Sequence, residues 1–129
     1  MLTAHNPATI AAPASRYSHA IEARGPGRWL HVSGQVGVRP DGTIPADSEG
    51  QMETAWTNLV AILREAGMTA DNLVKISTFI TDAADVGLAR RVRDRHLGAT
   101  APASTLLVVS RLAHPDYRFE IEAVAAAPE

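Results

Sequence analysis

The chain has 129 residues, of which 46% are hydrophobic and 20% charged, and its formal net charge is −2. This length gives room for one domain with a buried core, so we expect a single domain over residues 1–129. The small negative charge disfavours a polynucleotide partner, because such partners need a basic surface that neutralises phosphates.

The absence of cysteine from the sequence excludes disulfides and thiolate chemistry. The first residues lack the charged start and the apolar stretch of a secretory signal. No stretch approaches the ~20 apolar residues that are needed to span a bilayer. We therefore expect a soluble, cytoplasmic protein without a membrane partner.

The first third of the chain is predicted to hold a loose lead-in and a β-hairpin. Residues 1–16 are rich in Ala and Pro, and the two prolines would break a helix. Residues 18–23 precede a turn at 24–28, and residues 29–33 have the character of a returning strand. We interpret 18–23 and 29–33 as the two strands of one hairpin.

Two amphipathic helices are predicted from apolar residues that recur at spacings of three and four. The first begins at Ser48, whose hydroxyl is expected to cap the helix, and ends before Gly67. The second extends over residues 82–97, and Gly98 serves as its stop.

Three further strands are predicted beside these helices. Residues 73–80 are rich in β-branched side chains. Residues 106–109 are apolar on both faces, which predicts a strand at the centre of its sheet. In residues 119–125 apolar and polar side chains alternate, which places Glu120 and Glu122 on the face opposite the apolar one. The order of elements predicts an α+β domain with two helices packed on one face of a mixed sheet.

Arginines crowd the second predicted helix at positions 90, 91, 93 and 95. Aspartates dilute them, and Arg90 and Asp94 form an i, i+4 pair. We interpret this surface as a solvated, salt-bridged face rather than as a nucleic-acid stripe.

Several short motifs follow one another along nearly the whole chain. They are Tyr17 after the Pro-containing lead-in, Val32-Ser33-Gly34-Gln35, Ala66-Gly67-Met68, Leu73-Val74-Lys75 with Phe79, Pro102-Ala103, and Phe119-Glu120-Ile121-Glu122-Ala123-Val124-Ala125. In this order and at these spacings they resemble the Rid family, also called YjgF-like or L-PSP-like proteins. The resemblance implies a chorismate-mutase-like α+β fold, assembled as a homotrimer with an inner barrel of sheets and clefts between subunits. It also implies hydrolysis of enamines or imines to ketoacids and ammonia without metal or organic cofactor.

The resemblance assigns candidate site residues as well. Tyr17, Ser33 and Glu120 match positions that line the family's cleft, and Glu120 matches the acid that positions or protonates water and the substrate nitrogen. The family's deaminases carry an arginine directly after the Pro-Ala pair, where its guanidinium grips the substrate carboxylate through two hydrogen bonds. This chain has Ser104 there. Arg90 aligns with an asparagine of active deaminases and is our candidate for the charge that Ser104 lacks.

Few residues in the sequence are candidates for metal binding, nucleophilic catalysis or further acid–base catalysis. The five histidines show no metal-ligand spacing, so we expect neither a metal site nor a cofactor. Ser33 lacks the elbow motif of a nucleophile, and a hydrogen bond to a ligand is its expected role. His31 shares a strand face with Ser33 and is either an acid–base group or an exposed imidazole. Glu122 is left without an assigned role.

Three functions follow from these residues. The first is a cofactor-free deaminase or hydrolase that acts on a small polar metabolite other than the usual 2-imino acid, with Glu120 as its catalytic group. The second is a non-catalytic homotrimer that binds a small ligand. The third is an RNA-directed activity, as described for some relatives, which nothing in this sequence independently supports.

Overall fold

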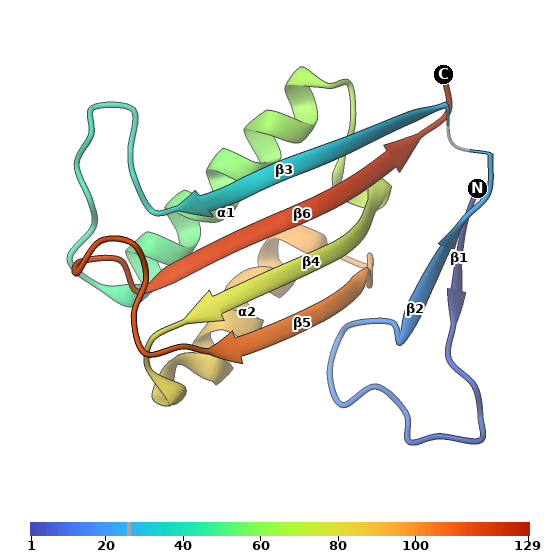
Figure 1. The fold of residues 1–129 in the computed structure, drawn as a ribbon, viewed down its shortest axis with the longest axis horizontal. Helices are drawn as coiled ribbons and strands as arrows, with labels where there is room; N and C mark the ends of the chain where they lie inside the picture. The colour runs from blue at the N-terminus through green and yellow to red at the C-terminus, as the bar shows by residue number, and fades with distance from the viewer. Residues whose placement is uncertain (26) are drawn as a thin grey trace.

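A four-stranded mixed sheet forms the centre of the molecule in the computed structural model, which describes residues 1–25 and 27–129 (Figure 1). The strand order is β3–β6–β4–β5, with bounds of Arg28–Val36 for β3, Phe119–Ala127 for β6, Leu73–Ile80 for β4 and Ala103–Val108 for β5. Strand β6 is antiparallel to both β3 and β4, whereas β5 is parallel to β4.

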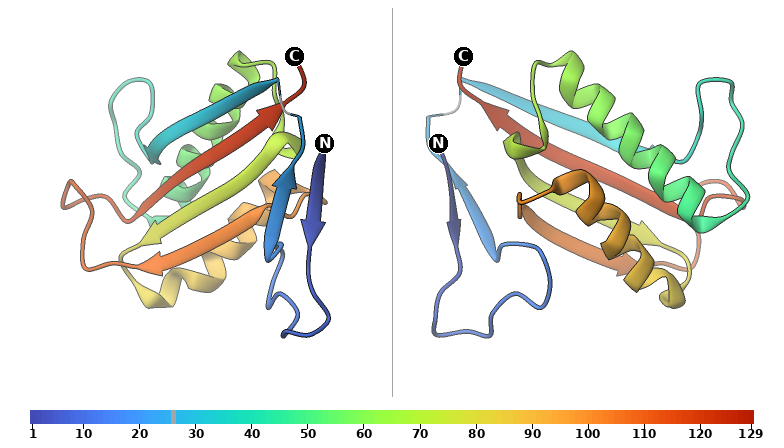
Figure 2. Two further views of the ribbon diagram at one scale, coloured as in Figure 1. Left: turned by 45° about the vertical axis from the view of Figure 1, so that its right-hand side comes forward. Right: turned by 180° about the vertical axis from the view of Figure 1, so that it is seen from behind.

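Helices α1 (Ser48–Glu65) and α2 (Val86–Leu97) cover one face of this sheet, as seen from behind in Figure 2. Their apolar stripes are fully buried at Met52, Leu59 and Val92. They pack on inward-facing side chains of β4 and β6, such as Ile76 and Ile121, which are also fully buried. The predicted α+β class, with two helices on one face of a mixed sheet, is confirmed.

The alternation predicted for β6 is also confirmed. Phe119 and Ile121 are buried beneath the helices, while Glu120 and Glu122 lie on the opposite face beside Phe79 and Ser77 of β4. We call the face of the main sheet that points away from the helices the open face. Its side chains include His31, Lys75, Ser77, Phe79, Glu120, Glu122 and Val124.

The predicted hairpin between residues 18–23 and 29–33 is wrong. Strand β2 (Ala20–Ala23) instead pairs with β1 (Leu2–His5) in a separate two-stranded sheet, and β3 pairs with β6 (Figure 1). Pairing of two nine-residue strands buries Val32 against the hydrophobic core. A four-residue partner close in sequence offers no such burial, so packing overrides nearness along the chain.

The predicted central position of the apolar run 106–109 is wrong as well. Strand β5 lies at the edge of the main sheet, where β4 is its pairing partner among the described strands. Leu106 packs against the core, whereas Leu107 and Val108 are 48% and 50% exposed. The open-face side of this strand, at Leu107, is therefore uncovered in a single chain, and so is Val108 at the strand end, although Val108 lies on the same side as Leu106.

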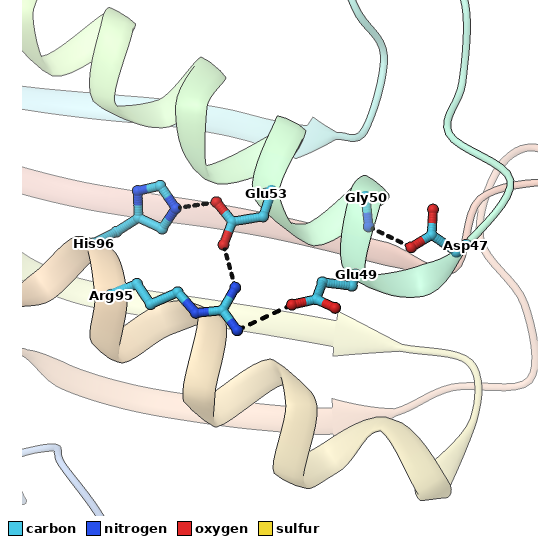
Figure 3. A network of polar contacts seen from close by, with 6 residues as sticks. All are labelled: Asp47, Glu49, Gly50, Glu53, Arg95 and His96. Carbon is cyan, nitrogen blue, oxygen red and sulfur yellow. Dashed lines mark hydrogen bonds and ion pairs between the residues drawn. The ribbon is translucent and has the colours of Figure 1, made fainter.

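The first turn of α1 is capped by Asp47, not by Ser48 as predicted. The Asp47 carboxylate accepts a hydrogen bond from the backbone N–H of Gly50 at 3.2 Å (Figure 3). Ser48 is already helical, and its hydroxyl donates to Asp85 at 2.8 Å. Asp47 has the extended backbone that an N-cap requires, and its carboxylate carries the charge that the helix N-terminus favours.

Helix α2 is shorter than predicted because residues 83–85 form a 3₁₀ turn, η2 (Ala83–Asp85), capped by Asp82. Its predicted end is confirmed: Gly98 follows the last helical residue with φ of +61°, in the left-handed region that favours glycine. A second 3₁₀ turn, η1 (Ala70–Asn72), leads directly into β4.

Charged side chains join the two helices across their outer surfaces (Figure 3). Arg95 of α2 contacts Glu53 at 2.8 Å and Glu49 at 3.0 Å on α1. His96 contacts Glu53 at 2.8 Å, and its ring stacks on Trp56 with centroids 5.6 Å apart. Burial would raise the pKa of the Glu53 carboxyl, but hydrogen bonds from His96 and Arg95, together with their charges, bring it below its ordinary value.

The predicted i, i+4 pair between Arg90 and Asp94 does not form, and Asp94 pairs with the adjacent residue in sequence instead. Asp94 accepts a hydrogen bond from Nε of its neighbour Arg93 at 3.0 Å. Arg90 has no carboxylate partner among the described residues, so its guanidinium is available for other contacts.

Candidate functional site

Three of the residues chosen from the sequence line one pocket of about 220 Å³ at the edge of the main sheet. We call it the α2 pocket, and its lining residues are Ser15, Tyr17, Arg90, Arg93, Ser104 and Leu106. Ser104 pairs in register with the buried Ile76 and so lies on the helix side of β5. The structure thus brings Tyr17, Arg90 and Ser104 together.

The segment that carries Tyr17 is fixed to the start of β5 by hydrogen bonds. The backbone N–H of Ser18 donates to the carbonyl of Pro102 at 3.1 Å, and its hydroxyl donates to the carbonyl of Ala101 at 2.5 Å. Arg16 adds a bond from its guanidinium to the carbonyl of Gly98 at 2.7 Å. These contacts place Tyr17 beside a strand that follows it far along the sequence.

Two arginines of α2 face this pocket, and the sequence reasoning identified one of them. Arg90 is exposed, whereas Arg93 is 8% exposed and is held in place at two nitrogens. Its Nε donates to Asp94 at 3.0 Å and its Nη2 donates to the hydroxyl of Ser15 at 3.2 Å. The available signal for Arg93 was its spacing of three from Arg90, which puts both on one helix face. No sequence signal pointed to Ser15.

Glu120 lies away from this pocket, on the open face near the middle strands. Its carboxylate is half-buried and rests against Gly34 of β3, where an added Cβ would overlap the Glu120 Oε2 atom. A β-bulge between Val32 and Gln35 shifts the strand register at the same point. Bulges of this kind often re-aim side chains next to active sites. Glycine at position 34 therefore makes room for the carboxylate.

Ser33 lies at the same end of the open face as Glu120. Its side chain is exposed, and its carbonyl accepts a hydrogen bond from the Gln35 amide at 3.0 Å. Ser33 precedes Gly34 directly, so it lies near the Glu120 carboxylate rather than near Ser104. The five predicted site residues therefore form two groups, separated by strand β4 and by the thickness of the sheet.

The two residues whose roles were left open in the sequence share a second pocket. His31 and Glu122 line a hollow of about 280 Å³ on the open face, together with Lys75 and Ser77. The ammonium of Lys75 donates to the hydroxyl of Thr105 at 2.6 Å. This pocket contains side chains of both charges, Lys75 and Glu122. It is distinct from the α2 pocket.

The histidines and acids do not form a metal site in the part of the chain that the structure describes. Across residues 1–25 and 27–129, no three His, Cys, Asp or Glu side chains are grouped so as to hold a metal ion. His5 and His96 contact glutamates instead, at 3.2 Å from Glu22 and 2.8 Å from Glu53. In the same part of the chain, no helix is both long and apolar enough to cross a membrane.

The sequence model of a family described as endoribonuclease L-PSP matches residues 8–127. The chain belongs to this family. A RutC family protein of Synechocystis is 35% identical over 122 residues, which cover 91% of this chain and 90% of that protein. TdcF of Escherichia coli, whose name gives it as a candidate reactive intermediate deaminase, is 36% identical over 104 residues, or 77% of this chain and 79% of TdcF.

Solved structures of the Rid family share the fold. The Rid-family protein YyfB of Yersinia pestis superposes with a TM-score of 0.87 at 30% identity, covering 97% of this chain and 98% of YyfB. TdcF of Escherichia coli, in a structure with bound serine, gives a TM-score of 0.71 at 33% identity and covers 91% and 90% of the two chains. The resemblance to the Rid family that the motifs indicated is confirmed.

Proposed function

We propose that this Rid-family protein is a cofactor-free hydrolase that releases ammonia from a small polar imine or enamine other than the usual 2-imino acid. The observation that carries the proposal is the α2 pocket, where Tyr17, Arg90 and Ser104 border one cavity. The likeness to TdcF supports the reaction class. Ser104 supports a changed substrate, because a hydroxyl has no charge and cannot grip a carboxylate as a guanidinium fork does.

Both groups of site residues would meet in a homotrimer with its clefts between subunits. Glu120 lies on the open face, whereas the α2 pocket lies on the helix side at the sheet edge, so one protomer does not join them. Exposed Trp29 and Leu107 leave apolar surface on the open face. Symmetric association is the common way to cover such surface. We place this assembly in the cytoplasm, as the sequence led us to expect.

In the proposed reaction the substrate is anchored in the α2 pocket of one protomer, and its C=N carbon faces Glu120 of a neighbour. The Glu120 carboxylate takes a proton from water as the water oxygen bonds to that carbon. Glu120 returns this proton to nitrogen, which gives an amino alcohol, and then transfers the proton of the new hydroxyl to nitrogen as well. The C–N bond then breaks to give a carbonyl product and ammonia. Tyr17 and Ser33 are expected to hold the substrate by hydrogen bonds from their hydroxyls.

Replacing Glu120 tests the catalytic step. Glu120→Gln should lower kcat by about 10²–10⁴-fold on whichever imine of a substrate panel the native protein turns over, because general acid–base catalysis contributes about that much. Ammonia release is the measurement. Glu122→Gln, two residues along the same strand face, is the matched control and should keep most of the activity. Equal losses in both variants would contradict the role of Glu120.

The substitution Ser104→Arg tests the altered substrate. It should confer hydrolysis of 2-iminobutanoate, because it restores a carboxylate-gripping fork beside the same pocket. The native protein should hydrolyse 2-iminobutanoate poorly, and turnover at the rate of an active deaminase would overturn the proposal. If no imine, enamine, amide or ester is turned over while a small ligand raises the melting temperature, the non-catalytic alternative is correct.

A further inference from the structure

We propose that the α2 pocket recognises the dianionic phosphate group of a small phosphorylated ligand, held by Arg93 and Arg90. The inference rests on the proposed function, since it names the substrate class of the same pocket. Arg93, which the sequence reasoning did not single out, is the residue on which it depends.

The α2 pocket carries positive charge. Two guanidinium groups line it and none of its lining residues is acidic. Asp94 pairs with Nε of Arg93, but it lies outside the lining and is 34% exposed. The Asp94 carboxylate therefore partly offsets the charge of Arg93. Arg90 has no carboxylate partner in the described part of the chain. A phosphate monoester carries a charge of about −1.5 to −2 at pH 7, which suits two guanidinium groups better than a single carboxylate does.

Arg93 is held in a fixed position beside the pocket. Its side chain is 10% exposed, and bonds to Asp94 and Ser15 engage its Nε and Nη2. Arginine has five N–H donors, and the hydrogen bonds of Arg93 within the described residues engage Nε and Nη2 but not Nη1. A guanidinium already held in one orientation loses little conformational entropy when it binds an anion.

Hydroxyl groups line the pocket beside the two arginines. Ser15, Tyr17 and Ser104 add three O–H donors to those of the two arginines. A phosphate group has three terminal oxygens that accept several hydrogen bonds at once, while a carboxylate has two oxygens. Leu106 supplies an apolar wall beside these donors, where the carbon skeleton of the ligand can lie.

Binding of inorganic phosphate to the full chain, measured by calorimetry at constant ionic strength, tests the inference. Arg93→Lys keeps the charge but removes the fork, and Arg90→Ala removes the second guanidinium. Each should weaken phosphate binding by about tenfold or more, because charge-assisted hydrogen bonds are lost. Arg91→Ala is the matched control, since Arg91 is exposed on the same helix and does not line the pocket. Ser104→Asp, which sets a carboxylate into the pocket, should also abolish binding.

Several results would overturn the inference. Among them are no phosphate binding by the native chain, equal loss in Arg91→Ala and Arg93→Lys, or acetate bound as tightly as phosphate. If an RNA oligonucleotide without terminal phosphate binds more tightly than inorganic phosphate, and the same variants lose this binding, the pocket recognises phosphodiesters instead. Phosphate bound without imine turnover would remove the proposed function alone, whereas turnover without phosphate binding would remove this inference alone.

Discussion

Gly37 packs so closely against Gln51 of α1 that a side chain at this position would collide with backbone atoms. A Cβ there would come within 2.6 Å of Cα and 2.7 Å of the carbonyl oxygen of Gln51. Gln51 is itself fixed, because its buried amide bonds the carbonyls of Pro45 at 3.0 Å and Asp116 at 2.8 Å. The close approach of β3's end to α1 therefore requires glycine.

We accordingly expect Gly37→Ala to lower the free energy of unfolding by about 1–3 kcal/mol, the usual cost of overpacking. Urea denaturation measures it. Gly87→Ala is the matched control, because its added Cβ would meet only the Arg91 side chain, at 3.4 Å. Better helix propensity should make that variant neutral or more stable by up to about 1 kcal/mol. Similar losses in both variants would contradict the crowding at Gly37.

The contacts of Glu53 predict a pH dependence of stability. Its pKa lies below the ordinary value of 4.5, since hydrogen bonds from His96 and Arg95 outweigh the effect of burial. A depressed pKa stabilises the fold above the unfolded-state pKa, and this contribution is lost as pH falls through the folded-state pKa. The native protein should therefore be more stable than Glu53→Gln above about pH 4.5, by no more than about 1 kcal/mol because the pair is solvent-screened. Melting curves should converge below that pH; a constant difference down to pH 2 would refute this.

At the scale of the helix, the start of α1 depends on Asp47. Removing its carboxylate in Asp47→Ala should cost about 1 kcal/mol, within the range of 0.5–2 found for lost N-caps. Asp47→Asn should cost much less, because an amide oxygen can accept the same hydrogen bond from Gly50. Thermal unfolding of the two variants compares them directly. Equal destabilisation would assign the effect to the charge of Asp47 and not to its cap.

At the scale of the strands, the main sheet is set by pairs that are distant in sequence. Strand β6 lies between β3 and β4, so residues near the C-terminus complete a sheet that begins with Arg28. The alternation of apolar and polar residues along β6 indicated which side chains face the helices. It does not indicate which strands pair with β6, because the same alternation is compatible with any partner strand. The pairing of β3 with β6 extends along both nine-residue strands and places Val32 in the hydrophobic core, and local turn signals do not express this.

At the scale of the whole molecule, the uncovered open face predicts self-association. The proposed trimer should sediment at about three times the chain mass of 13.7 kDa. Val124→Arg places a charge in the middle of the open face and should yield folded monomers, seen by sedimentation together with an unchanged circular dichroism spectrum. Thr57→Arg, on the exposed side of α1, should leave the assembly intact. A native chain that sediments as a monomer would remove both the trimer and the intersubunit site.

The sequence by itself determined the class of fold, the two helices, the faces of β6 and the family, because periodicity and ordered motifs are properties of the chain alone. It also pointed to Tyr17, Arg90 and Ser104, which prove to share a pocket. Only the tertiary structure decided that β2 pairs with β1 and not with β3, that β5 lies at an edge, and that Arg93 lines one pocket with Arg90 and Ser104. Those outcomes depend on which surfaces bury one another over long separations in sequence, and no local pattern records that choice.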